Sequence, residues 1–261
     1  MLAAPVTNAV LRDACQIPRG ASRLAAVALQ RAARRRGIDT QRLLAAILLA
    51  CQVHRQQQRN ADGQPYVLHP LQVALLVCCW GGSGDDVLAA VLHDTAEDSI
   101  TGPRATLNHI TDLFGPRVAG RVAALTKNRG IADPEARADD HRRRLLQAAQ
   151  SSGPGVVATR LADRLHNCIT SAHFDAARLQ RLHRHTLEHV VPLAQALRLP
   201  ALAGFLAGPP ADWHVVQAQQ FLSVMLALQR PWLGEAGWVS DDAAACQGAH
   251  WPRLRSAGEA A

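Results

Sequence analysis

The stretch VLAAVLHDTAED, residues 87–98, decides the fold of this 261-residue chain. Its first half carries apolar side chains at the spacing of one buried helix face. Its second half brings one imidazole and three carboxyl groups together. Glu97 stands four residues after His93, and Asp98 four after Asp94, so a helix would place each pair on one face. Acids beside a buried apolar stripe are costly unless a cation neutralises them, which predicts a metal site. A hydrated, salt-bridged helix end is the alternative.

The chain around this stretch has the composition of a helical protein. Alanine, leucine, arginine and glutamine dominate it, and all four favour helices. Aromatic residues make up only 4%, and Tyr66 is the one tyrosine, which argues against a large β-sandwich or barrel. Hydrophobic residues at 48% and charged residues at 19% exclude general disorder, and no apolar run approaches the length of a membrane span. We therefore expect an all-α fold without a membrane partner.

Apolar periodicity and turn residues predict where the helices lie. One helix is expected to start at Asp85 or Asp86, after the break at Gly81–Gly84. The other expected helices cover residues 22–36, 43–57, 71–80, 105–114, 117–126, 139–150, 156–171, 176–196 and 213–230. Thr40 and His69 are the expected N-caps of the second and third of these, with Pro70 as a first helical residue. Gly208, Pro209 and Pro210 predict a linker.

Two further segments carry polar side chains that suit a metal or a ligand. In YVLHP, residues 66–70, the proline fixes His69 at a helix N-terminus, although an N-cap or surface histidine is the commoner case. In LADRLHN, residues 161–167, and just beyond it, polar side chains at helical spacing form one stripe in apolar surroundings: Asp163, His166, Asn167 and Thr170. A buried polar stripe needs partners, which are either a metal or ligand or a structural Asp–Arg–Asn network.

Charge and cysteine content limit the partners and the compartment. The net charge of +7 and the pI of about 9.8 favour an anionic partner, either a nucleic acid or a small phosphate ester. Arg31 and Arg34–Arg36 form one basic helix patch without an aromatic platform, so we do not expect a nucleic acid as partner. None of the six cysteines forms a CxxC pair, so we expect buried free thiols in a cytoplasmic protein.

Taken together, these segments resemble a known family. PYVLHP at 65–70, HDTAED at 93–98 and LADRLHN at 161–167 follow in the order found in the hydrolase domain of RelA/SpoT homologues, a branch of the HD-domain phosphohydrolases. LTK at 125–127 and EHVVPLA at 188–194 are also similar to that domain. The resemblance covers about residues 40 to 200. It implies an HD-domain helical bundle with an additional C-terminal helix and tail.

The resemblance also implies an activity and roles for single residues. The family removes the 3′-pyrophosphate of the guanosine alarmones (p)ppGpp, giving GDP or GTP plus pyrophosphate, with a divalent ion, usually Mn²⁺, that activates the attacking water. The implied metal ligands are His69, His93, Asp94 and Asp163. Glu97 and Asp98 resemble the acidic pair that handles the water and its protons. The residues that resemble nucleotide-binding ones are Arg59, Asn167 and Thr170.

The same comparison predicts how the chain is divided. We expect an N-terminal helical extension at 1–39, the hydrolase domain at 40–200, and a Trp-rich helix and tail at 201–261. Too few residues follow position 200 for a synthetase domain, so the resemblance is to small, hydrolase-only alarmone hydrolases. Three roles stay open for the tail: packing on the core, covering the site, or forming a homo-oligomer contact.

Alternatives to the alarmone reaction follow from one loop. In the loop that precedes His69, the family commonly has two neighbouring basic residues. In this chain Arg59 is followed by Asn60 and Ala61. An HD phosphohydrolase that acts on another small-molecule nucleotide, such as an adenosine alarmone or NADPH, is therefore the second hypothesis. A non-catalytic nucleotide-binding regulator is the third.

Overall fold

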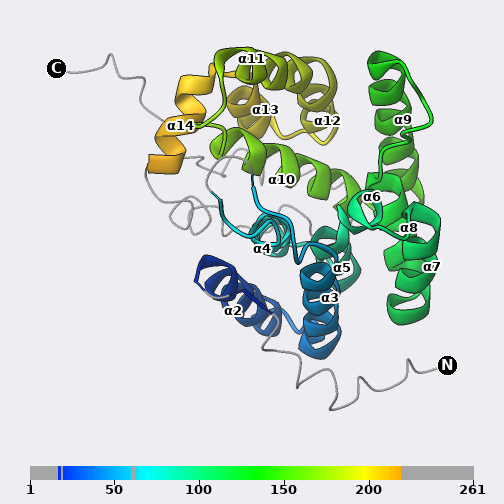
Figure 1. Cartoon of the computed structure of the whole chain (residues 1–261). Coiled ribbons are helices and arrows are strands. Elements are labelled where there is room, and N and C mark those ends of the chain that lie inside the picture. The colour runs from blue at the N-terminus through cyan, green and yellow to red at the C-terminus, as the bar shows by residue number, and fades with distance from the viewer. Residues whose placement is uncertain (1–16, 19, 60–62, 219–261) are drawn as a thin grey trace.

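A computed structural model describes residues 17, 18, 20–59 and 63–218 (Figure 1). The described residues are helical and contain no strand, which confirms the all-α prediction. One isolated antiparallel bridge joins Gln58 to Pro65 and closes the loop between the second and third helices of the described chain. None of the helices in the described ranges is both long enough and apolar enough to cross a membrane.

The helices follow one another through short connections. The bounds of the helices that build the core are α2 (Ala21–Arg35), α3 (Thr40–Val53), α4 (Leu68–Cys79), α5 (Gly84–Leu92), α6 (Thr95–Asp98), α7 (Pro103–Phe114), α8 (Pro116–Leu125), α9 (Pro134–Ser152) and α10 (Gly155–Ile169). A second series follows: α11 (Ala176–His185), the π-helix η2 (Thr186–Val190), α12 (Val191–Ala196), α13 (Pro200–Ala207) and α14 (Pro210–Ala218).

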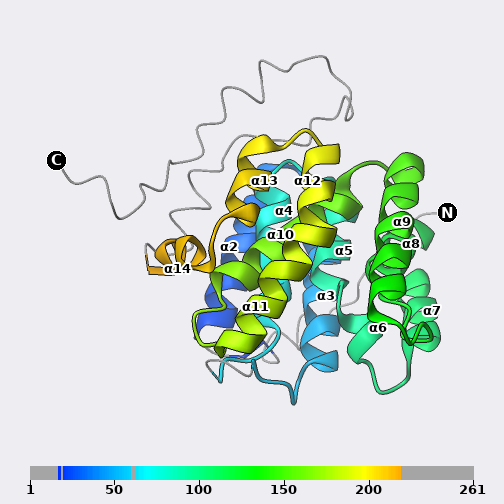
Figure 2. The ribbon, with the colours of Figure 1, turned by 90° about the horizontal axis from the view of Figure 1, so that it is seen from above.

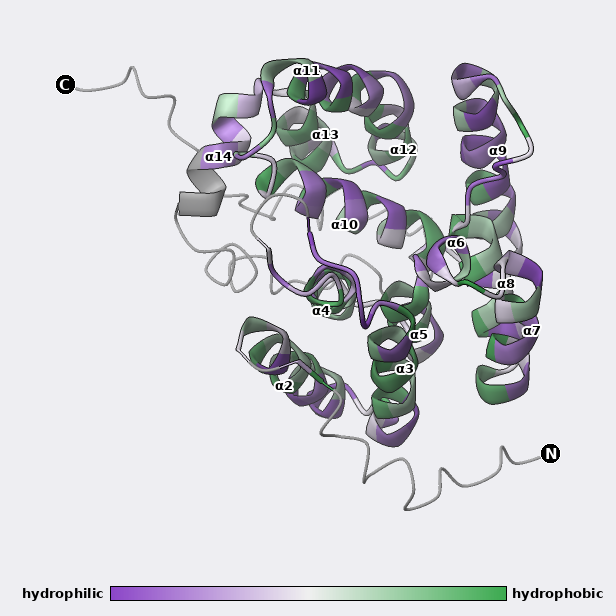
Figure 3. Cartoon of the chain, viewed as in Figure 1, coloured by the Kyte–Doolittle hydropathy of each residue, from purple (hydrophilic) through white to green (hydrophobic). Residues whose placement is uncertain are grey.

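Helix α10 is the centre of the bundle (Figures 1 and 2). It packs against α4, α5, α9 and α14, and every residue of it except Asn167 is buried. Helix α5 packs in turn against α3, α4 and α8, and α2 covers α4. Hydrophobic faces of these helices turn toward one another (Figure 3). Because α10 is enclosed, its charged residues Arg160, Asp163 and Arg164 need partners inside the protein.

Helix N-termini differ in detail from the sequence predictions. Asp39, not Thr40, caps α3, because its backbone is extended and its side chain accepts hydrogen bonds from the amides of Gln41 and Arg42. Helix α5 begins at Gly84 rather than at Asp85 or Asp86, since Ser83 and Asp86 form a capping box.

Helix α4 also starts earlier than the sequence predicted. His69 lies in its first turn and is not its N-cap, because α4 begins at Leu68. Pro70 is tolerated here because amides in a first turn have no partner within the helix. This start places His69 on a buried, regular helix, with only 2% of the residue exposed.

The C-terminal helices were predicted least well. One helix over 176–196 is interrupted by the π-turn η2, which precedes Pro192, a residue without an amide hydrogen. Pro210 begins α14 instead of ending a linker, and Trp213 is fully buried with its Nε1 donating to the carbonyl of Phe205 at 3.1 Å. The rest of the expected 213–230 helix lies outside the described residues. The division at 39/40 and 200/201 stays a prediction.

Candidate metal centre

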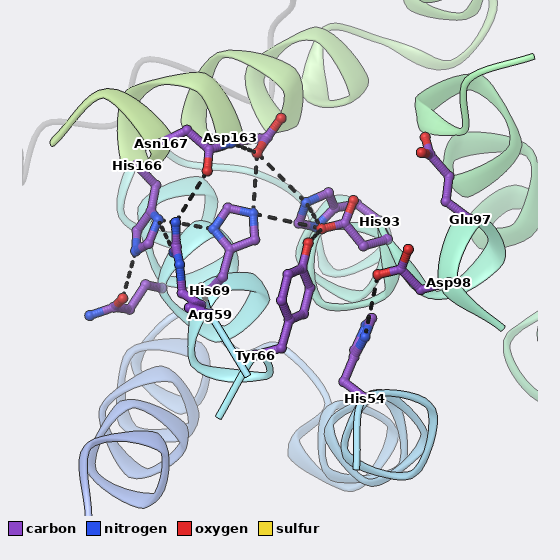
Figure 4. A network of polar contacts seen from close by, with 12 residues as sticks. His54, Arg59, Tyr66, His69, His93, Glu97, Asp98, Asp163, His166 and Asn167 are labelled. Carbon is purple, nitrogen blue, oxygen red and sulfur yellow. Dashed lines mark hydrogen bonds and ion pairs between the residues drawn. The ribbon is translucent and has the colours of Figure 1, made fainter. Parts of the chain in front are cut away.

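Two imidazoles and two carboxylates converge between α4, α5 and α10 (Figure 4). Nε2 of His69 lies 3.2 Å from Oδ1 of Asp163 and 3.7 Å from Oδ2 of Asp94. Nε2 of His93 lies 3.1 Å from Oδ2 of Asp94 and 3.9 Å from Oδ1 of Asp163. The structure thus brings together all four side chains for which the sequence predicted metal ligation.

His93 is held in one orientation by its own helix. Its Nδ1 donates to the carbonyl of Ala90 at 2.8 Å, in the last turn of α5, where carbonyls lack helical partners. Since a carbonyl can only accept, the proton belongs on Nδ1 and the lone pair of a neutral ring on Nε2. This Nε2 is buried and makes no hydrogen bond within the described part of the chain. When the ring is neutral, this atom offers its lone pair toward the carboxylates, as a metal-ligating imidazole nitrogen does.

Neighbouring side chains hold the two carboxylates. The hydroxyl of Tyr66 donates to Oδ2 of Asp94 at 2.7 Å. Asn167 donates to Oδ1 of Asp163 at 2.6 Å, and Arg160 donates to Oδ2 at 2.6 Å. Partners of this kind fix the direction in which a carboxylate offers its remaining lone pairs.

The electrostatics of the cluster favour a cation. Burial lowers the pKa of His93, but the carboxylates of Asp94 and Asp163 outweigh burial and raise that pKa to about 9. Burial lowers the pKa of His69. Burial alone would raise the pKa of Asp163, yet the hydrogen bond with His69 and the charge of Arg160 hold it well below its ordinary value. The carboxylates are therefore ionised, and their negative potential attracts positive charge.

A divalent ion fits this donor set. Neighbouring ligands of an octahedral ion with bonds of about 2.1 Å are roughly 3.0 Å apart, and opposite ligands about 4.2 Å. The four imidazole–carboxylate distances lie between 3.1 and 3.9 Å, and ligand atoms of His69, His93 and Asp94 all lie within 4.8 Å of one another. Imidazole with carboxylate suits a borderline metal such as manganese or iron.

The three residues with predicted nucleotide contacts also lie together, next to the metal ligands. Arg59 donates from Nη2 to Oδ1 of Asn167 at 3.3 Å and to Oγ1 of Thr170 at 3.0 Å. Asn167 in turn bonds Asp163. The loop that carries Arg59 is thereby tied to the C-terminal end of α10.

Glu97 and Asp98 stand on α6 beside this cluster and face other partners (Figure 4). Glu97 accepts from the backbone amide of Lys127 at 2.7 Å, and Arg129 lies 3.6 Å from its other oxygen. Asp98 lies 3.7 Å from Nδ1 of His54. Helix α5 ends at Leu92, so the continuous helix face expected from His93 to Asp98 is broken at the junction with α6.

A cavity of about 250 Å³ lies between α9, α10 and the α11–η2 segment, and we call it the cationic pocket. Four of its lining side chains are Lys127, Arg137, Arg142 and Arg160, and three are His141, His185 and His189. Arg160 connects the two sites, because it lines the pocket while donating to Asp163.

Three contributors were not predicted from the sequence. Arg160 stands one turn before Asp163, and this spacing was an available signal. His166 was seen only as part of a polar stripe, yet its ring contacts His69. No sequence pattern marks Gln72, which meets His166 across the bundle.

Comparisons with known proteins agree with this geometry. The HD domain family model matches residues 45–199. A guanosine-3′,5′-bis(diphosphate) 3′-pyrophosphohydrolase of Aquifex aeolicus is 36% identical over 141 residues, which are 54% of this chain and 19% of that protein. The bifunctional (p)ppGpp synthase/hydrolase SpoT of Escherichia coli K12 is 33% identical over 185 residues, covering 67% of this chain and 25% of SpoT.

These curated relatives are much longer than the matched region, which spans a quarter or less of their length. Among solved structures, a metazoan ortholog of SpoT described as hydrolysing ppGpp superposes with a TM-score of 0.47 at 24% identity, over 70% of this chain and 94% of that one. With the family model covering most of the chain, the protein belongs to the HD domain family, and its HD domain is related to the ppGpp hydrolase domains of RelA/SpoT homologues.

Proposed function

We propose that this protein hydrolyses the 3′-pyrophosphate of (p)ppGpp to give GDP or GTP and pyrophosphate. The observation that carries the proposal is the convergence of His69, His93, Asp94 and Asp163 beside the cationic pocket. A cation site next to a cluster of guanidinium groups suits a substrate with several phosphates. The names of the curated relatives support guanosine alarmones, and we place the activity in the cytoplasm with its nucleotide substrates.

The proposed roles divide between the two sites. His69, His93, Asp94 and Asp163 would hold one divalent ion, which we propose to be Mn²⁺. Such an ion supplies two things to a hydrolase: it lowers the pKa of water and offsets negative charge on a phosphoryl oxygen.

Side chains of the protein would transfer the protons and bind the substrate. Glu97 and Asp98, on α6 at the edge of the site, would accept and return protons during attack and departure of the leaving group. Arg59, Asn167 and Thr170 would bind the nucleotide, and the cationic pocket would bind phosphate groups. Lys127 lines that pocket and its amide holds Glu97, so the phosphate-binding and proton-transfer parts of the site are joined.

A second candidate substrate class follows from the loop of Arg59. Its guanidinium already bonds His166, Asn167 and Thr170 at the C-terminal end of α10. Arg59 is therefore not dedicated to binding the nucleobase. Recognition of guanine would then rest on other groups, which favours an HD phosphohydrolase for an adenosine alarmone or NADPH as the runner-up.

The test is turnover by the purified, Mn²⁺-loaded protein on ppGpp, pppGpp, an adenosine alarmone and NADPH. Release of pyrophosphate and of the matching nucleotide would be followed by chromatography. We expect ppGpp and pppGpp to give the highest kcat/KM, with activity lost in EDTA and restored by Mn²⁺. If release from ppGpp stays at the rate without protein while another nucleotide is hydrolysed, the runner-up replaces the proposal. If no nucleotide is hydrolysed but all bind, a non-catalytic regulator replaces both.

A further inference from the structure

Two buried imidazoles face each other through the same type of nitrogen. Nδ1 of His69, on α4, lies 2.9 Å from Nδ1 of His166, on α10. Both residues are almost fully buried, with 2% and 1% of their surface exposed. Only one hydrogen fits between two nitrogens at this distance, so one ring must donate and the other must accept.

Contacts of His166 decide which ring accepts. Nη1 of Arg59 lies 3.0 Å from the same Nδ1 of His166, and a guanidinium can only donate. Nδ1 of His166 therefore carries the lone pair, which the two donors share. The proton of the neutral ring is then on Nε2, where the side-chain oxygen of Gln72 accepts it at 2.6 Å.

The consequence for His69 follows directly. Because His166 accepts, Nδ1 of His69 must donate, and the lone pair of His69 lies on Nε2. That atom is 3.2 Å from Asp163 and 3.7 Å from Asp94, so the lone pair points at carboxylates. A lone pair facing carboxylates is electrostatically unfavourable by itself, so the contacts of His166 hold the ring in a form that a cation between the lone pair and the carboxylates would stabilise.

The arrangement also fixes the position of the His166 ring. Gln72 stands three residues after His69, so the two side chains lie on the same face of α4, one turn apart. The ring of His166 thus contacts two successive turns of α4, with one nitrogen directed to each. Arg59 from the loop also contacts the ring.

We propose that His166, oriented by Gln72 and Arg59, is a positioning residue that holds His69 in the Nδ1–H tautomer and thereby presents Nε2 of His69 to a divalent cation. The inference rests on the proposed function only in that His69 is a metal ligand. It assigns roles to His166 and Gln72 that the metal ligands alone do not imply. Groups that fix the tautomer of a ligating histidine typically change metal affinity by about 10- to 100-fold.

The first experiment needs no variant and no nucleotide. Metal-free protein with ¹⁵N-labelled histidine would be examined by long-range ¹H–¹⁵N NMR, which distinguishes the two neutral tautomers. Assignments would come from His69→Gln and His166→Asn. We expect His69 to carry its proton on Nδ1 and His166 on Nε2. Finding the proton of His69 on Nε2 would overturn the inference.

The second experiment measures the Mn²⁺ dissociation constant by titration with detection of free Mn²⁺ by EPR. His166→Phe should weaken binding by about 10- to 100-fold. His166→Asn should recover most of the loss, because its amide oxygen can accept from Nδ1 of His69. Gln72→Met, which removes the acceptor without changing the bulk, should weaken binding by a smaller factor and serves if His166→Phe does not fold.

A matched control is His183→Phe on α11, a partly buried histidine that packs on Trp213 and, in the described part of the chain, has no contact with the four ligands. It should leave the Mn²⁺ dissociation constant unchanged. Equal affinity of wild type, His166→Phe and Gln72→Met would sink the inference. Tight Mn²⁺ binding and the expected tautomers without ppGpp hydrolysis would instead refute the proposed function and leave the positioning role intact.

Discussion

Arg160 belongs to the surroundings of two groups of buried or half-buried histidines, and these surroundings have opposite charge. His69 and His93 face the carboxylates of Asp94 and Asp163, and the carboxylates raise the pKa of His93 to about 9. His141 and His185 line the cationic pocket. Burial lowers the pKa of His141 to about 3, and the neighbouring charges of Arg160, Lys127 and Arg144 act in the same direction.

The difference shows that residue type alone does not define a site. Imidazoles next to ionised acids form a place for a cation, whereas imidazoles next to guanidinium groups form a place for an anion. Arg160 donates to Asp163 in the first group and lines the second, so a metal and a phosphate group can be bound side by side. The predictions below separate the two groups.

The largest difference is expected between His93→Ala and His141→Ala. Removing His93 deletes a proposed metal ligand, so Mn²⁺ affinity should fall by more than the roughly 100-fold that supporting residues produce, and activity should disappear with it. His141→Ala should bind Mn²⁺ like the wild type. Isothermal titration of both metal-free proteins with Mn²⁺ checks this, and equal losses in the two variants would refute the division.

A smaller, purely kinetic effect is expected for Glu97→Gln. The substitution keeps the shape and the hydrogen bond to the amide of Lys127 but removes the proton acceptor. Mn²⁺ affinity should stay within about twofold, while kcat falls by roughly 10²- to 10⁴-fold, as for loss of a general base. Full activity of Glu97→Gln would show that another group accepts the proton, and Asp98 would be the first candidate.

The candidate metal ligands were more predictable from sequence than the cationic pocket. His93 follows an apolar helix whose own carbonyl at Ala90 orients it, so local spacing marked it as a candidate. The proposed orientation of His69 depends on two contacts of His166. His166 is 97 residues from His69 and 94 from Gln72 along the chain, and such distant pairs have no local signature. The family resemblance supplied the order of these segments, not their contacts.

The cationic pocket lacked even a local signal. Its side chains come from α9, α10 and the segment at η2, and the last of these was predicted as a plain helix. The π-turn shifts the register of the residues that follow it, so the face on which His189 and Leu193 lie could not be predicted from a 3.6-residue period. Apolar periodicity did predict the long helices, because it reports burial of one helix face directly.

Acid should destabilise the metal-free protein through the pocket histidines. His141 and His185 have pKa values of about 3 in the folded protein, owing first to burial, and about 6.5 when unfolded. Below pH 6.5 the unfolded chain binds more protons, so stability falls as pH drops from 6.5 toward 3, by about 1.4 kcal/mol per pH unit for each imidazole.

Urea denaturation of metal-free wild type and His141→Ala at pH 7, 6 and 5 measures this dependence. The variant is less stable at pH 7 because it leaves a cavity, but its slope against pH should be smaller by about 1.4 kcal/mol per unit. Parallel curves would mean that the pKa of His141 is the same in the folded and unfolded protein, which would contradict a cationic pocket.

The smallest effect is expected on substrate affinity alone. Arg137 lines the pocket and donates to the carbonyl of Ile131, whereas Arg143 on the same helix has a 74% exposed side chain and pairs with Asp140. Arg137→Gln should raise KM for ppGpp by about fivefold with kcat and Mn²⁺ affinity unchanged, since one charge–phosphate contact in a partly solvated pocket contributes about 1 kcal/mol. Arg143→Gln should leave KM unchanged.

If the two variants behave alike, the phosphates are bound elsewhere and the pocket has no part in substrate recognition. If only Arg137→Gln raises KM, and the effect shrinks with added salt, the phosphate groups lie in the pocket that Arg160 joins to the metal site.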